Sequence, residues 1–268
     1  MGMVNRTKRL SAGRSGQIGH LSGYHKEGLM YRAKFETYGT KQTIRVVGCG
    51  GTGGFVAEGL ARLLPPEWEI DLQDFDRVEE RNLLRQNFFA QDLGRFKSEA
   101  LAERLSNNYR RAIGYYVIPY SDDAHEFGRS GDIIIGCVDN AAARRAISKS
   151  STGWWIDAGN DQYSGQVLIG NSNEIRKDSY SENSKLARDV LKPHLQLPSI
   201  LDPSSNTPVR IDCATAVQRE EQSPVINQMM ATLVLNSVDA LINHRLTWQA
   251  QYVDLESGTL STILIKEK

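Results

Sequence analysis

The chain has 268 residues, of which 40% are hydrophobic and 24% are charged, and this composition is typical of a globular protein. Its 32 Lys and Arg residues equal its 32 Asp and Glu residues, so no overall charge would attract nucleic acid or an anionic membrane. The chain contains no continuous apolar run of the length that a membrane span or a signal sequence requires. We therefore expect a cytoplasmic protein with neither nucleic acid nor membrane as a partner.

The first hundred residues predict an arm followed by a βαβ unit. Residues 1–40 mix Gly, Ser, Arg and Lys without a helical or strand period, which indicates a flexible N-terminal arm. The β-branched run at 44–47 predicts a strand, and residues 55–64 have helical spacing up to two consecutive prolines. Residues 68–74 alternate apolar and polar side chains, as the second strand of a nucleotide-binding unit would.

The middle of the chain continues this alternation. Residues 98–109 predict a second helix, 115–120 another strand and 140–150 a further helix. The apolar run at 132–138 predicts a strand in the middle of a parallel sheet, because such strands are buried on both faces. Alternating strands and helices indicate a doubly wound sheet.

The pattern changes in the last part of the chain. Residues 165–170 follow a strand at 154–157 too closely for a crossover helix, which indicates antiparallel strands. Residues 171–212 are rich in Ser, Asn, Lys and Pro, so we expect a loop insert there. Residues 224–244 have the spacing of an amphipathic helix.

Two short strands, near Tyr252 and Ile263, are predicted to close the chain. The sequence thus predicts an α/β fold, a doubly wound Rossmann-like mixed sheet whose parallel nucleotide-binding half is followed by antiparallel strands. We expect residues 41–268 to form this single domain.

A Gly-x-Gly-Gly-x-Gly loop at 48–53 joins the first strand to the first helix. Such a loop lets the backbone approach a phosphate and points the positive end of the helix at it. Asp74, at the end of the second strand, would hydrogen-bond ribose hydroxyls. Dinucleotide enzymes share these features, so an NAD-dependent oxidoreductase is an alternative at this point. The candidate nucleotide-binding glycines are Gly48, Gly50, Gly51 and Gly53.

Polar residues beyond the glycine loop favour a triphosphate over a nicotinamide. A carboxylate that attacks the α-phosphorus of ATP passes through a crowded anionic transition state, which cations and hydrogen-bond donors stabilise. Arg85 and Lys97 can supply the positive charge, and Asn82 can donate to an oxygen. Asp139 can hold a Mg²⁺ ion that bridges the phosphates. Gln86, near Arg85, and Asn140, beside Asp139, complete this set.

Each of these residues, taken singly, has a simpler interpretation. Arg85 and Lys97 could be solvated surface cations, and Asn82 a helix cap. Asp139 could cap the helix that follows it. The joint occurrence of all four favours the nucleotide site, with Arg85, Lys97 and Asp139 as candidate catalytic residues.

Four motifs occur in a fixed order: Gly-x-Gly-Gly-x-Gly at 48–53, Asp-x-Asp-x-Val-x-x-x-Asn-Leu-x-Arg-Gln at 74–86, Leu-Gly-x-x-Lys at 93–97, and Cys-x-Asp-Asn at 137–140 with Arg144. Together they resemble the ThiF, MoeB and ubiquitin-activating enzyme superfamily. The segments at 136–147, 159–170, 226–228 and 253–258 are more narrowly similar to ThiF-like proteins of bacterial PRTRC-type systems, and related enzymes occur in bacterial ubiquitin-like conjugation operons.

The resemblance implies Mg-ATP-dependent adenylation of the C-terminal glycine carboxylate of a small ubiquitin-like protein. The residue matching Asp74 binds ribose in that family, those matching Asn82, Arg85 and Lys97 contact phosphates, and the one matching Asp139 organises Mg²⁺. Asp76, Gln86 and Asn140 lie in the same motifs and are counted with the nucleotide-binding residues. The resemblance further implies a homodimer, and a conjugating enzyme or a sulfur donor as the next acyl acceptor.

The three cysteines, Cys49, Cys137 and Cys213, form no Cys-x-x-Cys pair, so we expect neither a disulfide framework nor a structural zinc ion. Cys213 is the candidate nucleophile for a thioester, because it follows the polar insert and matches the region of the family's acyl-accepting cysteine. Asp212 opposes this, since a neighbouring anion disfavours a thiolate. Cys49 and Cys137 are expected to be packed neutral thiols.

Relatives often supply an N-terminal arginine to the ATP site of the partner subunit. The candidates in this chain lack a recognisable local motif, and the sequence does not choose among them. They are Arg6, Arg9, Arg14 and Arg32.

Overall fold

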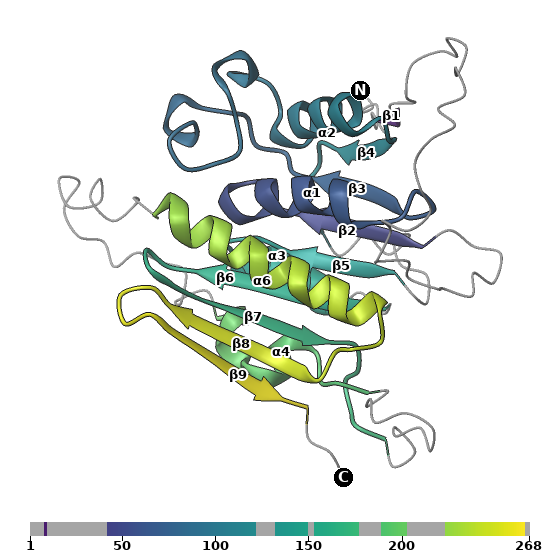
Figure 1. The fold of residues 1–268 in the computed structure, drawn as a ribbon, viewed down its shortest axis with the longest axis vertical. Coiled ribbons are helices and arrows are strands. Elements are labelled where there is room, and N and C mark those ends of the chain that lie inside the picture. Colours follow the sequence, from purple (N-terminus) through teal and green to yellow (C-terminus); the bar gives the residue numbers. More distant parts are fainter. Residues whose placement is uncertain are drawn as a thin grey trace, which may run out of the picture.

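A computed structural model describes residues 8–9, 42–121, 132–149, 153–176, 189–202 and 223–265. These residues form one nine-stranded mixed sheet in the order β1-β4-β3-β2-β5-β6-β7-β8-β9. Helices cover both faces of the sheet, and α1 and α6 lie side by side on the face nearest the viewer in Figure 1. The doubly wound α/β fold predicted from the sequence is confirmed.

The amino-terminal half is the parallel part of the sheet. Each strand in the series β4-β3-β2-β5-β6 runs parallel to its neighbour. The strands are β2 (Thr43–Val47), β3 (Glu69–Gln73), β4 (Ile113–Tyr116), β5 (Ile133–Gly136) and β6 (Trp154–Asn160). The helices are α1 (Gly51–Leu63), α2 (Lys97–Tyr109) and α3 (Ala141–Lys149), with two 3-10 turns, η1 (Glu80–Asn82) and η2 (Ala90–Asp92).

The carboxyl-terminal half is antiparallel, as the short spacing after β6 predicts. β7 (Ser164–Gly170), β8 (Trp248–Asp254) and β9 (Thr259–Leu264) each run antiparallel to the strand before them in the sheet. The two-residue β1 (Lys8–Arg9) pairs antiparallel with β4 at the opposite edge. The remaining helices are α4 (Pro193–Gln196), η4 (Pro198–Leu201) and α6 (Pro224–Ile242).

Side chains of β5 alternate between two hydrophobic cores, one on each face of the sheet. On β5, Ile133 and Ile135 pack in the larger core with residues of α1, α2 and α6. Ile134 points to the other face, where it packs in a smaller core with Ile147 of α3 and Ile200 of η4. Burial on both faces explains why this strand reads as a continuous apolar run.

One helix of the described residues, α6, is apolar and long enough to cross a membrane by length and composition, with a mean hydropathy of 1.4. It is not the continuous apolar run whose absence was noted in the sequence, because polar residues such as Asn227, Gln228 and Asp239 interrupt it. The helix packs against α1, β6 and β7, and residues such as Ile226, Met230 and Val234 belong to the larger core. Core helices of globular proteins have the same composition.

Some boundaries differ from those predicted. α1 begins at Gly51 rather than at residue 55, because its first turn consists of the glycine-rich loop, which carries no helical pattern of apolar residues. β4 ends at Tyr116 rather than at residue 120, and Pro119 lacks the N–H that a strand ladder needs. The loop insert expected at 171–212 contains α4 and η4. Residues 177–188 and 203–212 of the insert lie outside the described residues, as do residues 213–222 after it and the expected arm apart from β1.

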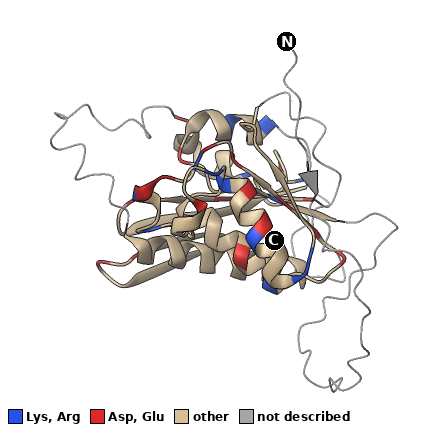
Figure 2. Ribbon diagram, turned by 90° about the horizontal axis from the view of Figure 1, so that it is seen from above, with Lys and Arg blue, Asp and Glu red and all other residues tan. Residues whose placement is uncertain are grey.

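Acidic and basic residues are interspersed along the described helices and strands (Figure 2). Any strong local field must therefore come from a particular group of side chains.

Candidate functional site

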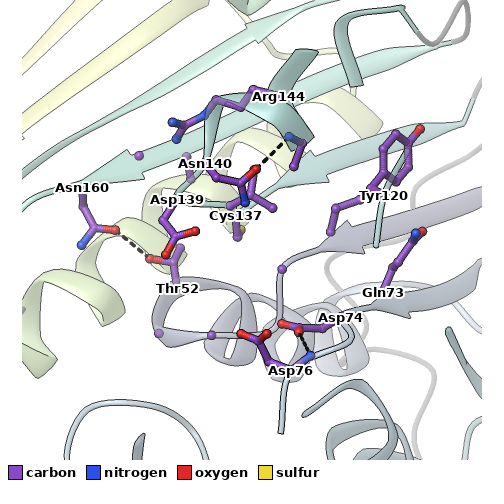
Figure 3. A pocket seen from close by; sticks show the side chains of 18 of the residues that line it. Thr52, Gln73, Asp74, Asp76, Tyr120, Cys137, Asp139, Asn140, Arg144 and Asn160 are labelled. Carbon is purple, nitrogen blue, oxygen red and sulfur yellow. Dashed lines mark hydrogen bonds between the residues drawn. The ribbon is translucent and has the colours of Figure 1, made fainter. Parts of the chain in front are cut away.

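A cavity of about 920 Å³ opens at the carboxyl ends of the parallel strands, which is where ligands bind in open α/β sheets. Figure 3 shows side chains around it from different elements, among them Gln73 of β3, Arg144 of α3 and Asn160 of β6. Ten of the residues predicted from the sequence line this cavity: Gly48, Gly50, Gly51, Asp74, Asp76, Arg85, Gln86, Lys97, Asp139 and Asn140. Gly53 and Asn82 do not line it, and Cys213 lies outside the described residues.

The glycine loop is shaped by close backbone contacts. Gly48 has a φ of +88°, and a Cβ there would lie 2.5 Å from the carbonyl oxygen of Cys137. A Cβ on Gly53 would lie 1.8 Å from the carbonyl oxygen of Gly48, so Gly53 lets α1 pack against the loop rather than contact a ligand. The N-cap residue of α1 is Gly50, which has no side chain that could cap the helix. The first N–H groups of α1 are therefore available to an anion.

Asp74 holds the glycine loop against the end of β3. Its Oδ2 accepts a hydrogen bond from the backbone N–H of Cys49 at 2.7 Å, and its Oδ1 accepts one from the N–H of Asp76 at 2.8 Å. Burial raises the pKa of Asp74, while the hydrogen bonds from Cys49 and Asp76 and the charge of Lys97 act in the opposite direction. This carboxylate, predicted from the sequence to bind ribose, therefore also holds the loop.

Lys97 brings a buried cation to the cavity. Its side chain is only 9% exposed, and Nζ lies 3.1 Å from Oδ2 of Asp76, whose side chain is 54% exposed. Because the partner carboxylate is solvated, the pair is weakly held, and Lys97 can turn to a phosphate oxygen.

Arg85 and Gln86 line the cavity on the segment after η1, but Asn82 faces elsewhere. The Oδ1 of Asn82 accepts a hydrogen bond from the N–H of Glu79 at 2.9 Å and so caps η1. This position matches the simpler interpretation of Asn82 as a helix cap. The structure thus brings Arg85, but not Asn82, to the wall of the cavity.

Asn227 of α6 ties this segment to the rest of the site. It is 1% exposed, and its Nδ2 donates to the carbonyl oxygen of Arg85 at 3.3 Å. Its Oδ1 accepts from Nδ2 of Asn160 at 3.4 Å, and Asn160 in turn accepts from Oγ1 of Thr52 at 3.2 Å. A Cβ on Gly51 would lie 2.5 Å from the Asn227 side chain. These three residues were not counted among the site residues from the sequence, although Thr52 lies in the glycine loop and Asn160 and Asn227 lie in segments matched to ThiF-like proteins. Their contacts join elements that are far apart in the chain.

Asp139 points into the cavity from the end of β5 (Figure 3). The N-cap of α3 is its neighbour Asn140, whose Oδ1 accepts from the N–H of Ala143 at 2.8 Å. The interpretation of Asp139 as a helix cap is therefore wrong. Its exposed carboxylate makes no hydrogen bond to another described residue and remains open to a ligand.

Residues 35–262 match the sequence profile of the ThiF family, which covers most of the chain. The chain belongs to the ThiF family. It is 30% identical over 134 residues to ubiquitin-like modifier-activating enzyme 5 of Gallus gallus, a match that covers 44% of this chain and 33% of that protein. It is 32% identical over 108 residues to adenylyltransferase and sulfurtransferase MOCS3 of Caenorhabditis briggsae, covering 39% and 26% respectively. The matches thus span about a third or less of these relatives.

Solved structures share the fold of this ThiF-family protein. The crystal structure of E. coli MccB with ATP has a TM-score of 0.55 and 18% identity, and the match covers 85% of this chain and 64% of that one. The crystal structure of PaaA has a TM-score of 0.57 and 17% identity, covering 84% and 73%. At these identities the likeness establishes the fold, including the mixed sheet that places the cavity.

The cavity of this ThiF-family protein fits a nucleoside triphosphate. The glycine loop and the start of α1 offer backbone donors, and Arg85 and Lys97 offer cations. Gln73 and Gln86 line the cavity, and each has a buried side-chain oxygen without a hydrogen-bond partner, as a site shaped for a polar ligand would. For Mg²⁺, no group of three or more His, Cys, Asp or Glu ligands occurs among the described residues. One protein carboxylate, that of Asp139, is sufficient for a Mg²⁺ ion whose other ligands are waters and phosphate oxygens.

Neither described cysteine is a thiolate. Burial raises the pKa of Cys49 far above its ordinary value, and the charge of Asp74 raises it further. Burial also raises the pKa of Cys137, with a further contribution from Asp157. Both thiols are therefore neutral, as expected from the sequence, and a covalent step needs another residue.

Proposed function

We propose that this protein is an ATP-dependent activating enzyme that adenylates the C-terminal glycine carboxylate of a small ubiquitin-like protein. The observation that carries the proposal is the convergence of the glycine loop, Arg85, Lys97 and Asp139 around one cavity. Carboxylate attack on the α-phosphorus of ATP forms an acyl adenylate and releases pyrophosphate, and this set of groups stabilises the anionic transition state. A nicotinamide cofactor needs the glycines and the ribose-binding acid but not the two cations.

Each group has a part in this reaction. Asp74 binds the ribose, and the N–H groups at the start of α1 receive a phosphate. Arg85 and Lys97 neutralise the departing pyrophosphate. Asp139 would hold Mg²⁺, which would supply charge neutralisation at the phosphates. Membership of the ThiF family and the similarity to ubiquitin-like modifier-activating enzyme 5 support this class of reaction.

Isotope exchange tests the proposal. Labelled pyrophosphate should enter ATP only when the ubiquitin-like protein is present, because exchange requires reversible formation of the adenylate. Binding of ATP without exchange would replace the proposal with a non-catalytic scaffold. Bound nicotinamide without exchange would replace it with an oxidoreductase.

For the second step we propose that Cys213 captures the acyl group as a thioester and passes it to a conjugating enzyme, within a cytoplasmic homodimer. A sulfur-carrier adenylyltransferase, which hands the adenylate directly to a sulfur donor, is the second candidate. The similarity to the adenylyltransferase and sulfurtransferase MOCS3 favours it. A thiol-labile adduct between this chain and the modifier separates the two versions.

A further inference from the structure

The end of the cavity between α3, β6 and β7 holds two polar side chains that the reaction above does not use. Arg144 of α3 is 5% exposed and lines the cavity. Its Nε donates to Oδ1 of Asp157 at 3.1 Å, while neither Nη atom makes a hydrogen bond to another described residue. Gln166 of β7 also lines the cavity, and its carboxamide makes no hydrogen bond within the described part of the chain.

These two side chains approach the same point above Gly159 of β6. A Cβ built on Gly159 would lie 2.9 Å from Nη2 of Arg144 and 2.7 Å from Nε2 of Gln166. The absence of a side chain therefore leaves room next to two nitrogen donors. A guanidinium has no acceptor, so a position shared by these donors suits an anionic oxygen.

Arg144 is held ready for such an anion. Asp157, which is 0% exposed, binds its Nε edge and fixes the plane of the guanidinium. The Nη edge is left for a ligand, and a carboxylate matches the fork of two parallel N–H donors. Because the side chain is already ordered, little rotamer entropy is lost when the ligand binds.

The position in the sheet indicates which anion binds there. Asp74 follows β3 and Gly159 lies on β6, and the strand order separates them by three steps, or roughly 14 Å at the usual strand spacing. Lys97, which pairs with Asp76, lies on the Asp74 side, and the glycine loop after β2 lies between the two ends. The backbone of Arg85 is tied through Asn227 to Asn160, next to Gly159. Displacement at phosphorus is in line, so the attacking group enters on the side away from the leaving pyrophosphate.

We propose that Arg144 and Gln166, above Gly159, bind the carboxylate of the acyl substrate and position it for attack on the α-phosphorus. The inference rests on the proposed adenylation but assigns a separate subsite, for a free carboxylate at the end of a peptide chain. Arg144 and Gln166 are positioning residues in this scheme. The subsite should discriminate a terminal carboxylate from a terminal amide even when no nucleotide is bound.

The test uses a short synthetic peptide ending in Gly-Gly, with a free carboxylate or a C-terminal amide, titrated into the full chain with and without a non-hydrolysable ATP analogue. Two variants are compared. Gln166→Glu puts a carboxylate beside Arg144, and Gln162→Glu makes the same charge change at an exposed site of the β6–β7 turn that does not line the cavity.

The wild-type chain should bind the acid at least about tenfold more tightly than the amide, since a hydrogen bond to a charged group is worth that much or more. Gln166→Glu should lose about tenfold for the acid while its affinity for the ATP analogue stays within about twofold. Gln162→Glu should behave as wild type. Equal binding of acid and amide, no binding of the acid, or equal effects of the two variants would overturn the subsite. Absence of nucleotide binding to the wild type would overturn the adenylation proposal instead.

Discussion

Replacement of Arg144 by methionine removes the cation beside a carboxylate that is wholly buried. Asp157 is 0% exposed, and Nε of Arg144, 3.1 Å away, is its hydrogen-bond partner. Removal of one partner of a buried ion pair costs about 3–5 kcal/mol, because the remaining charge is left without compensation. We therefore expect Arg144→Met to lower the free energy of unfolding by about that amount at neutral pH, or Tm by about 6–10 °C.

The loss should depend on pH. Burial already raises the pKa of Asp157 in the wild type, and Arg144 is the group that lowers it. Without Arg144 the folded-state pKa rises further above the unfolded value. Stability is then fully present below the unfolded pKa, near about 4, and is lost as pH rises towards the folded pKa, by up to about 1.4 kcal/mol per pH unit. Arg144→Met should thus be less destabilised at about pH 5.5 than at about pH 7.5.

Urea unfolding followed by circular dichroism at the two pH values measures both effects. A second variant, Arg144→Met with Asp157→Asn, serves as the control, because removing both charges of a buried pair is close to neutral. It should regain most of the stability and lose the excess pH dependence. A loss below about 1 kcal/mol for the single variant, or no rescue by the double variant, would show that the two side chains are not a buried pair in solution.

Three further predictions concern the glycine loop, the metal ligand and the second step. Gly53→Ala should lower the free energy of unfolding in urea by about 1–3 kcal/mol or more, because its Cβ would meet the carbonyl oxygen of Gly48 at 1.8 Å. Gly50→Ala, whose Cβ would have nothing nearer than 3.8 Å, is the control and should unfold near the wild-type midpoint. Equal losses of stability in the two variants would contradict the packing argument. Asp139→Ala should lose Mg²⁺-dependent pyrophosphate exchange by about 100-fold or more with an unchanged circular dichroism spectrum, and retained exchange would remove the metal assignment. Cys213→Ala should keep exchange but lose a thiol-labile adduct with the modifier on non-reducing gels, and an adduct that persists would place the nucleophile elsewhere.

Local patterns in the sequence were sufficient to predict the architecture. The apolar run on β5, the alternation along β3 and the glycines between β2 and α1 each report on burial or backbone geometry within a few residues. The short spacing from β6 to β7 excluded a crossover helix, so the change to antiparallel pairing was also local information. The motifs with Arg85, Lys97 and Asp139 were found for the same reason, since each follows a predicted strand or begins a helix.

Tertiary structure alone decided how these groups are placed and supported. Asn227 contacts the carbonyl oxygen of Arg85 from a position 142 residues later, and no local period could reveal that pairing. The competition between Asp139 and its neighbour for the cap of α3 depends on backbone geometry, which is why Asp139 is open to the cavity. The approach of Arg144 and Gln166 to Gly159 likewise exists only because α3, β6 and β7 meet at one end of the sheet. The sequence by itself determined which elements form, because burial periods and glycine turns are local; the convergence of side chains required the packed sheet, because it depends on contacts between distant segments.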